Sequence, residues 1–147
     1  MIEQVQIVQA SEKDWEKILS LLISCDLPVS DLNQKSASQF LIATDRSELV
    51  GCVGYERCGD YALLRSLAVR QDYRRRGIAQ KLTSEMECLC KSNGLNHVFI
   101  LTTTAYDFAT NQGFRVVERA HVPDEIRQTR QFSELCPCSA ICMTKEI

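Results

Sequence analysis

A basic turn followed by a small-residue helix start is the stretch of this sequence whose residues most clearly suggest chemistry. It consists of three arginines, a glycine and an alanine, namely Arg74, Arg75, Arg76, Gly77 and Ala79. A helix start offers unpaired backbone N–H groups and the positive end of a dipole, which together bind phosphate groups. Glycine lets the backbone approach such a ligand closely. The stretch predicts a phosphate-binding loop, and a basic loop that only caps a helix is the alternative.

Arg65 lies inside an apolar run, 61–69, whose composition is typical of a central strand buried on both faces. A guanidinium cannot lose its charge to ease burial, so it requires a partner. A substrate carboxylate or similar oxyanion could form a bidentate bond with it. An ion pair with Glu56 is the alternative, and both can hold at once.

Hydroxyls and further cations follow later in the chain. Thr102, Thr103 and Thr104 come after a second buried strand, where they can face a substrate or cap a short helix that begins near Tyr106. The segment 124–134 is rich in charge and predicts a helix that covers a cleft. It offers Arg127 and Arg130 as anion partners, although such charges usually form a solvated face.

The elements that must position these residues follow from the periodicity of apolar residues. Ser11 and Asp14 resemble a capping box at the start of the first helix, and Asn93 and Gly94 provide a left-handed stop for a later one. Strands are predicted at 3–9, 40–44, 48–55, 61–69, 98–101 and 114–118, and helices at 11–27, 31–38, 76–92, 106–111 and 124–134. This order predicts one mixed α/β sheet with helices on its faces.

Length and composition limit the class of protein. A chain of 147 residues fits one domain, 1–147, and a net charge of −2 gives no general reason to bind nucleic acid or an anionic membrane. Without an N-terminal targeting pattern or a long apolar run, a cytoplasmic protein is expected. Eight cysteines without a secretion signal are expected to be reduced thiols.

The turn and its surroundings resemble the GCN5-related N-acetyltransferases (GNATs). Their signature is Gln or Arg, two residues, Gly, one residue, then Gly or Ala, and here it follows a strand that ends in LAV. A second stretch, VFILTTTAYDFATNQGFRVV, is similar to the family's later strand, short helix and Gly-Phe strand. The chain is also similar to the acetyltransferase domain of bacterial N-acetylglutamate synthases. It is closer still to arsenic-resistance acetyltransferases (ArsN type), through LLRSLAV and FSELCPCSAICM.

The resemblance implies a GNAT fold of the α/β class: a single mixed, mostly antiparallel sheet of six to seven strands, flanked by helices and splayed between the fourth and fifth strands. It also implies acetyl-CoA as cosubstrate. The strand end would bond the pantetheine arm and the turn would hold the pyrophosphate. The implied cofactor-binding residues are Leu67, Ala68, Val69, Arg74, Arg75, Arg76, Gly77, Ile78 and Ala79.

The catalytic positions depart from the family pattern. Many family members carry a glutamate on this strand as the base, but Leu63 occupies that position here. Glu56 is the candidate that could replace it. The alternative is that Glu56 is only an exposed charge at the end of a strand. The family's usual acid is a tyrosine, but Ala109 occupies that position here, so Tyr106 is the candidate that could replace it. The alternatives are that Tyr106 only packs against other residues, and that water protonates the departing thiolate. Thr104 stands where glutamate-acetylating relatives carry arginine, which argues against glutamate itself as substrate.

These observations predict an acetyl-CoA-dependent N-acetyltransferase that acts on a small-molecule amine by direct, sequential transfer. An amino acid or amino-acid-like toxin is the expected substrate, a homodimer is possible, and no metal is expected. A sensor that binds acetyl-CoA or a metalloid without turnover is one alternative, suggested by Cys136, Cys138 and Cys142, which lack the partners of a zinc site. A protein or peptide acetyltransferase is the other.

Overall fold

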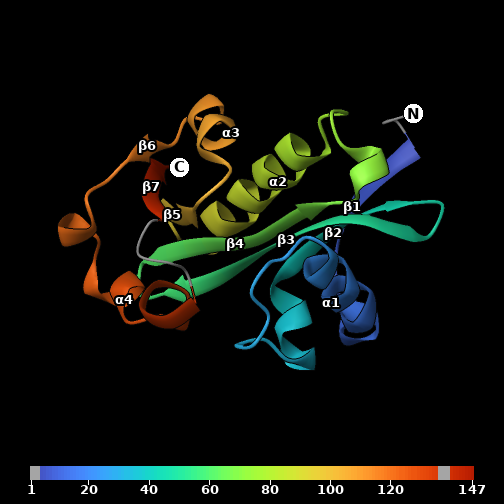
Figure 1. Ribbon diagram of the computed structural model, residues 1–147, viewed down its shortest axis with the longest axis horizontal. Coiled ribbons are helices and arrows are strands. Elements are labelled where there is room, and N and C mark those ends of the chain that lie inside the picture. The colour runs from blue at the N-terminus through green and yellow to red at the C-terminus, as the bar shows by residue number, and fades with distance from the viewer. Residues whose placement is uncertain (1–3, 136–139) are drawn as a thin grey trace. The chain divides into compact units, whose positions relative to one another are not determined.

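The computed structural model describes residues 4–135 and 140–147, and its strands form a seven-stranded sheet in the order β1-β2-β3-β4-β5-β7-β6 (Figure 1). The strands are β1 Val5–Gln9, β2 Phe40–Asp45, β3 Glu48–Cys58, β4 Tyr61–Val69, β5 His97–Thr102, β6 Arg115–Val116 and β7 Ile141–Glu146. The α-helices are α1 Trp15–Ser24, α2 Ile78–Ser92, α3 Tyr106–Asn111 and α4 Asp124–Arg127.

The strand pairs β1–β2, β2–β3, β5–β7 and β6–β7 are antiparallel. Strands β4 and β5 run parallel, and their ladder has three pairs, from Tyr61 opposite His97 to Leu63 opposite Phe99. Strand β4 continues to Val69 beyond this ladder, as a splayed fourth strand requires. The expected α/β class, the mixed and mostly antiparallel sheet, and its seven strands flanked by helices are confirmed.

The chain divides into two compact units. Unit 1 comprises the residues up to Tyr55 together with Ser66–Cys88, and unit 2 comprises Glu56–Arg65 together with all residues from Leu89 onward. Strands β3 and β4 and helix α2 therefore contribute residues to both units. The expectation of a single domain over 1–147 stays a prediction.

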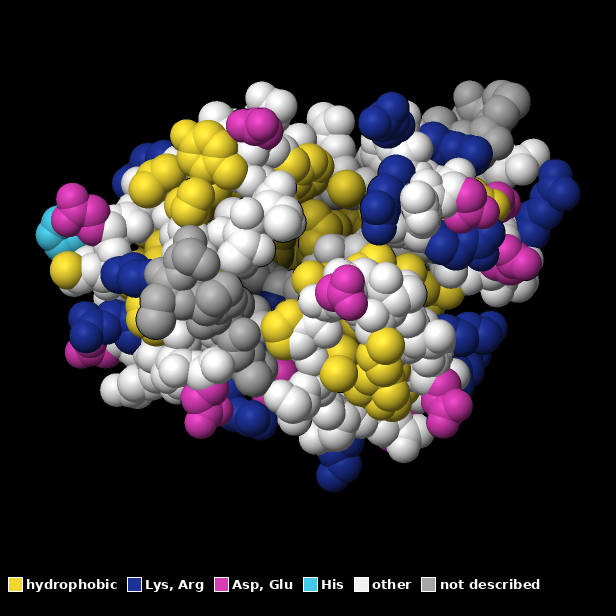
Figure 2. Space-filling view, viewed as in Figure 1, with side chains coloured by type: hydrophobic (Ala, Val, Ile, Leu, Met, Phe, Trp, Pro, Cys, Tyr) yellow, Lys and Arg dark blue, Asp and Glu magenta, His cyan; other side chains and the backbone are white. Residues whose placement is uncertain are grey.

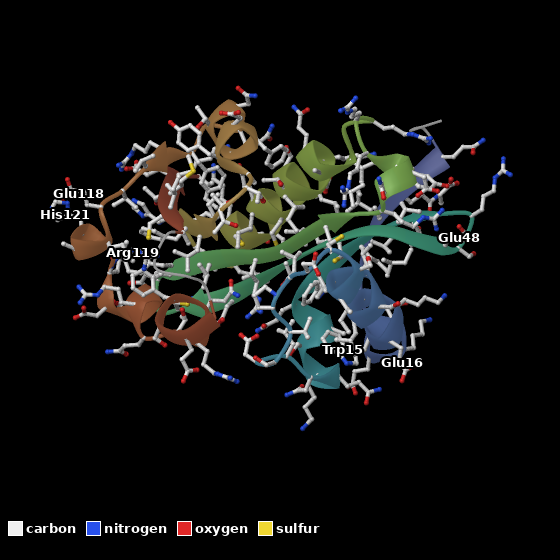
Figure 3. All side chains as sticks on the ribbon, in the orientation of Figure 1. Trp15, Glu16, Glu48, Glu118, Arg119 and His121 are labelled. Atoms are coloured by element: carbon white, nitrogen blue, oxygen red, sulfur yellow. The ribbon has the colours of Figure 1, made fainter. Side chains whose placement is uncertain are left out.

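Unit 1 has a core between α1 and the inner face of its strands. The carboxylate of Asp14 accepts a hydrogen bond of 2.9 Å from the backbone N–H of Ser11, which confirms the predicted capping box. Trp15, on α1 in Figure 3, meets the ring of Phe40 edge to face at 6.4 Å. Cys52 of β3 belongs to the same buried cluster. In Figure 1, α1 lies on one face of the unit 1 strands and α2 on the other.

Helix α2 packs on β3 at a glycine. A Cβ built on Gly51 would lie 3.1 Å from Leu82 Cδ1, 3.2 Å from the carbonyl oxygen of Ala68 and 3.4 Å from Ile78 Cγ2. Leu82 and Ile78 are buried. A residue without a side chain at this position therefore lets the first two turns of α2 approach the sheet closely.

Unit 2 has its own core, built on β5 and β7. Leu63, Phe99 and Cys142 of the strands pack against Ile126 of α4 and Val122, and all five are buried. This cluster fixes the position of α4 on its unit. Among residues 4–135 and 140–147, no helix combines the length and the apolar character needed to span a bilayer.

Three predicted helices begin differently from the expectation. The first, predicted at 11–27, is a 3-10 turn, Glu12–Asp14, followed by α1 at Trp15–Ser24. The predicted helix 31–38 is instead a 3-10 helix, Gln34–Gln39, whose first turn is held by Asn33 Oδ1 accepting from the N–H of Lys35 at 2.9 Å. Helix α2 begins at Ile78 and not at residue 76, because Gly77 has a positive φ of 80° that ends the preceding turn. The left-handed stop at Gly94, with φ of 83°, is confirmed.

Two elements of unit 2 are shorter than predicted. The strand predicted at 114–118 is the two-residue β6, because the N–H of Phe114 bonds the carbonyl of Ala109 at the end of α3. The helix predicted at 124–134 is a single turn, α4, followed by a π-helical turn, Gln131–Leu135. The buried Thr129 separates the two: its hydroxyl donates to the carbonyl of Ile126 at 2.7 Å and accepts from the N–H of Phe132 at 3.2 Å.

Candidate functional site

The basic turn between β4 and α2 has the backbone geometry of an anion-binding loop. Arg75 and Gly77 both take left-handed conformations, with φ of 65° and 80°, and positive φ is uncommon for a residue other than glycine. The carbonyl of Gly77 accepts from the N–H of Lys81 at 3.0 Å, so α2 starts directly after the glycine. The amides of the first turn, from Ile78 onward, consequently have no helical carbonyl to bond. The turn is equipped to receive an anion.

The side chain of Arg74 is bound by unit 1 itself. Its Nε donates to the carbonyl oxygen of Val69 at 3.0 Å, and its Nη2 lies 3.6 Å from the thiol sulfur of Cys25. These contacts tie the turn back to the end of β4. The side chains of Arg75 and Arg76 are exposed, and Figure 2 shows Lys and Arg side chains gathered over this part of unit 1. Of the three arginines, Arg74 has the clearest structural role.

Two residues that position this turn were missed by sequence reasoning. The phenol of Tyr73 donates a hydrogen bond of 2.5 Å to the carboxylate of Asp45, at the end of β2. Guanidinium groups of Arg70 and Arg76 lie over the ring of Tyr73, at 4.9 and 4.8 Å from its centre. An aromatic residue enclosed by arginines in the sequence was the available signal, because such pairs form cation–π contacts.

The end of β4 carries the residues expected to bond a pantetheine arm. Ser66 has a positive φ of 58° in the middle of the strand, and its carbonyl accepts a long hydrogen bond of 3.4 Å from the thiol of Cys52. A left-handed residue inside a strand interrupts the regular ladder. Of the three residues that follow, Ala68 and Val69 are buried and Leu67 is half-buried.

Arg65 and Glu56, both in unit 2, form an ion pair. Arg65 Nη1 lies 3.8 Å from Glu56 Oε1, which is beyond hydrogen-bonding distance for these two atoms. The Arg65 side chain is 3% exposed and that of Glu56 is 37% exposed. The pairing that the sequence left open is therefore present. A substrate anion as an additional partner of Arg65 stays a prediction, as does a role for Glu56 as base.

The threonines and the tyrosine around the start of α3 occupy different environments. The hydroxyl of Thr102 accepts from the N–H of Ala105 at 2.8 Å and from that of Thr104 at 3.3 Å, so it caps the turn before α3. Thr103 and Thr104 are exposed. Tyr106, the first residue of α3, is 43% exposed. Their expected contacts with substrate, and the role of Tyr106 as acid, stay predictions.

The cations on the segment after β6 carry acidic neighbours. Arg127 Nη1 lies 3.9 Å from Asp124 Oδ1, and Arg130 Nε donates to Glu134 Oε2 at 2.7 Å, with all four residues exposed. These are pairs on a solvated face, which was the alternative to anion binding. A substrate role for Arg127 stays a prediction.

The described cysteines form no disulfides. Burial raises the pKa of the Cys58 thiol to about 12, and it also raises the pKa values of Cys52 and Cys142. Buried thiols of this kind are poor nucleophiles. Cys136 and Cys138 lie outside the described residues. Within the described ranges, no group of three His, Cys, Asp or Glu side chains is arranged to hold a metal ion.

The seven-stranded mixed sheet, with its parallel pair of β4 and β5, matches the GNAT fold. The model of the acetyltransferase (GNAT) domain matches residues 36–116, and the chain belongs to this family. An uncharacterised N-acetyltransferase of Chlorobaculum tepidum is 28% identical over 110 residues, which are 74% of this chain and 70% of that protein.

Solved structures share the fold at low identity. An N-acetylglutamate synthase of Neisseria gonorrhoeae, complexed with coenzyme A and N-acetyl-glutamate, matches 97% of this chain with a TM-score of 0.84 and 18% identity. The chain spans only 35% of the length of that synthase. A Mycobacterium tuberculosis protein in complex with CoA matches 97% of this chain and 99% of its own, with a TM-score of 0.83 and 18% identity. Similarity to the arsenic-resistance type stays a prediction.

Proposed function

We propose that this chain is an acetyl-CoA-dependent N-acetyltransferase that acts on the amine of a small molecule. The observation that carries the proposal is the turn after β4, where left-handed Arg75 and Gly77 precede the open amides of α2. Membership of the GNAT family and the coenzyme A named for the two solved structures support acetyl-CoA as the donor.

In this proposal, unit 1 binds the donor. The amides of the turn and of the first residues of α2 hold the pyrophosphate, and the exposed Arg75 and Arg76 contribute positive charge. The backbone of 67–69 bonds the pantetheine arm as an added strand would. Arg74 contributes by holding the turn against the carbonyl of Val69.

The chemical step is direct transfer. The neutral nitrogen of the amine attacks the thioester carbonyl carbon, the carbon–sulfur bond breaks, and coenzyme A leaves as a thiolate that takes up a proton. The nitrogen loses one proton, which Glu56 or water accepts, and Tyr106 or water supplies the proton for the thiolate. No acyl-enzyme is required, in keeping with the raised pKa of the buried thiols.

An amino acid or a related molecule is the proposed acceptor class. Arg65 is a buried cation on β4, and its Nη1 lies 3.8 Å from Oε1 of Glu56. A substrate carboxylate would accept a bidentate pair of hydrogen bonds from the planar guanidinium fork. The N-acetyl-glutamate named for the Neisseria synthase structure is consistent with such a class. Thr104 replaces the arginine of glutamate-acetylating relatives, so glutamate itself is not proposed.

Isothermal calorimetry with coenzyme A tests the donor site. Gly77→Glu should abolish coenzyme A binding, because it puts a side chain and a negative charge into the proposed phosphate-binding turn. It also strains a backbone whose φ is 80°. Gly94→Glu is the matched control: φ is 83° there, and a Cβ would meet nothing within 4 Å. It carries the same strain and charge at the far end of α2 and should bind like the wild type. If both variants fold and bind coenzyme A equally well, then coenzyme A does not bind at this turn.

A further inference from the structure

Tyr73 occupies a central place in the turn that the proposed function assigns to phosphate binding. It ends a 3-10 helix, Gln71–Tyr73, that connects the end of β4 to the basic turn. Its ring lies between two guanidinium groups, those of Arg70 and Arg76. The phenol fixes the ring, because it donates to Asp45 on the neighbouring β2–β3 hairpin at 2.5 Å.

Asp45 depends on this hydrogen bond. Its Oδ2 accepts from Tyr73, while its Oδ1 is buried without a hydrogen-bond partner among the described residues. Asp45 as a whole is half-buried, but an inaccessible carboxylate oxygen without a partner is costly, so losing the hydrogen bond of the other oxygen to Tyr73 would add to this cost. The same bond raises the pKa of Tyr73 above its ordinary value, so the phenol stays a protonated donor at neutral pH.

The two arginines on the ring are in different electrostatic states. Arg70 donates to Asp72 at 2.8 Å and to Glu48, labelled in Figure 3, at 3.1 Å. Its charge is thereby neutralised. Within the described residues Arg76 forms no ion pair at 4.0 Å or less, and its guanidinium lies 4.8 Å from the centre of the Tyr73 ring. The pKa of Asp72 is lowered mainly by its hydrogen bond with Arg70, and the charge of Arg76 contributes least. Arg76 is thus the arginine of the pair whose charge remains available to an incoming anion.

We propose that Tyr73, anchored by Asp45, is a positioning residue that holds the guanidinium of Arg76 ready for a phosphate group of the acetyl donor. This inference rests on the proposed function. A long, exposed arginine loses much rotational freedom when it binds an anion, and a prior contact with a fixed ring reduces that loss. Tyr73 itself need not touch the ligand; it acts through Arg76.

A double-mutant cycle measured by calorimetry with coenzyme A tests the coupling. Tyr73→Leu and Arg76→Gln should each raise the dissociation constant by about tenfold, the size expected for one charge-assisted contact. The double variant should be no weaker than the weaker single variant, because Tyr73 has no separate contribution once Arg76 is lost. Arg46→Gln, which removes an exposed cation next to Asp45 on the same hairpin, is the matched charge control and should stay within about twofold.

The outcomes separate this inference from the proposed function. Two results would overturn the inference alone, provided that the wild type binds coenzyme A. In one, Tyr73→Leu binds as well as the wild type; in the other, the two single losses add to about a hundredfold in the double variant. Absence of binding by the wild type overturns both. If Tyr73→Leu loses its melting transition, Tyr73→Phe replaces it. The ring remains but loses its anchor on Asp45, so Arg76→Gln should cost less binding in that background than in the wild type. A full tenfold loss there would mean that the anchored ring does not position Arg76, which contradicts the inference.

Discussion

Arg65 is the single residue that most directly tests the proposed acceptor class. Arg65→Lys keeps the charge but loses the planar fork, and it should raise the Michaelis constant for the amine by about tenfold while that for acetyl-CoA stays nearly constant. Steady-state kinetics with each substrate varied in turn measures the two Michaelis constants separately. Glu56→Gln tests the alternative, because it removes the partner at 3.8 Å. An unchanged amine constant in Arg65→Lys, with a lower melting temperature in Glu56→Gln, would make Arg65 purely structural.

Cys58 should make stability depend on pH in the alkaline range. Burial raises the pKa of its thiol from an ordinary value of 9.0 to about 12 in the folded protein. Between these values the unfolded chain has lost the proton while the folded chain keeps it, so unfolding is increasingly favoured as pH rises. The slope should be about 1.4 kcal/mol per pH unit from this group. Urea unfolding from pH 9 to 10.5 should show a shallower loss of stability in Cys58→Ala than in the wild type, and parallel slopes would contradict the assignment.

The donor site depends on the close packing of helix α2 against the sheet. Gly51→Val would place methyl groups against Leu82 and the carbonyl of Ala68, both within 3.2 Å of even a Cβ. Overpacking of this kind costs about 1–3 kcal/mol. Urea unfolding should show this loss, with a smaller one for Gly51→Ala, and calorimetry should show weaker binding of coenzyme A because the start of α2 shifts. A Gly51→Val variant as stable as the wild type would show that the helix is not held this closely.

Elements with a clear local signal were predictable, and elements that depend on tertiary contacts were not. The bounds of β4 and α3 agree with the expectation, because a nearly continuous apolar run and a helical segment before a glycine leave few alternatives. The charged segment after residue 124 permits a longer helix as well as a single turn. A tertiary feature decides between them, since Thr129 is buried and its hydroxyl bonds the backbone on both sides. No local pattern marks that burial.

The site was predictable in part for the same physical reasons. The glycine turn and a helix after it follow from local sequence; Gly77 has a φ of 80°, and the helix begins two residues later than predicted. The contact between Tyr73 and Asp45 joins residues 28 positions apart, and the pairing of Arg65 with Glu56 depends on neighbouring strands. Such contacts are set by the tertiary fold. The sequence named the pair of Arg65 and Glu56 only as one of two alternatives, and it singled out neither Tyr73 nor Asp45.

At the scale of the whole molecule, family membership and fold define the donor more firmly than the acceptor. The family model covers residues 36–116, which include the turn and α2. The segment that follows, with α4 and the π-helical turn, lies outside that match. Arg65 and Tyr106 lie inside the matched range, but the acceptor-side proposals for them rest on these individual residues. A panel of amines is the suitable way to define the substrate.

The central claim, direct acetyl transfer from acetyl-CoA to a small amine, is tested most directly by initial-rate kinetics of thiol release with both substrates varied. For an accepted amino acid or related amine, one free thiol should appear for each acetylated amine, and double-reciprocal plots should intersect, as a sequential mechanism requires. Gly77→Glu should release none. Parallel lines, a trapped acetyl-cysteine, or binding of acetyl-CoA without release of thiol by any amine in the panel would contradict the account.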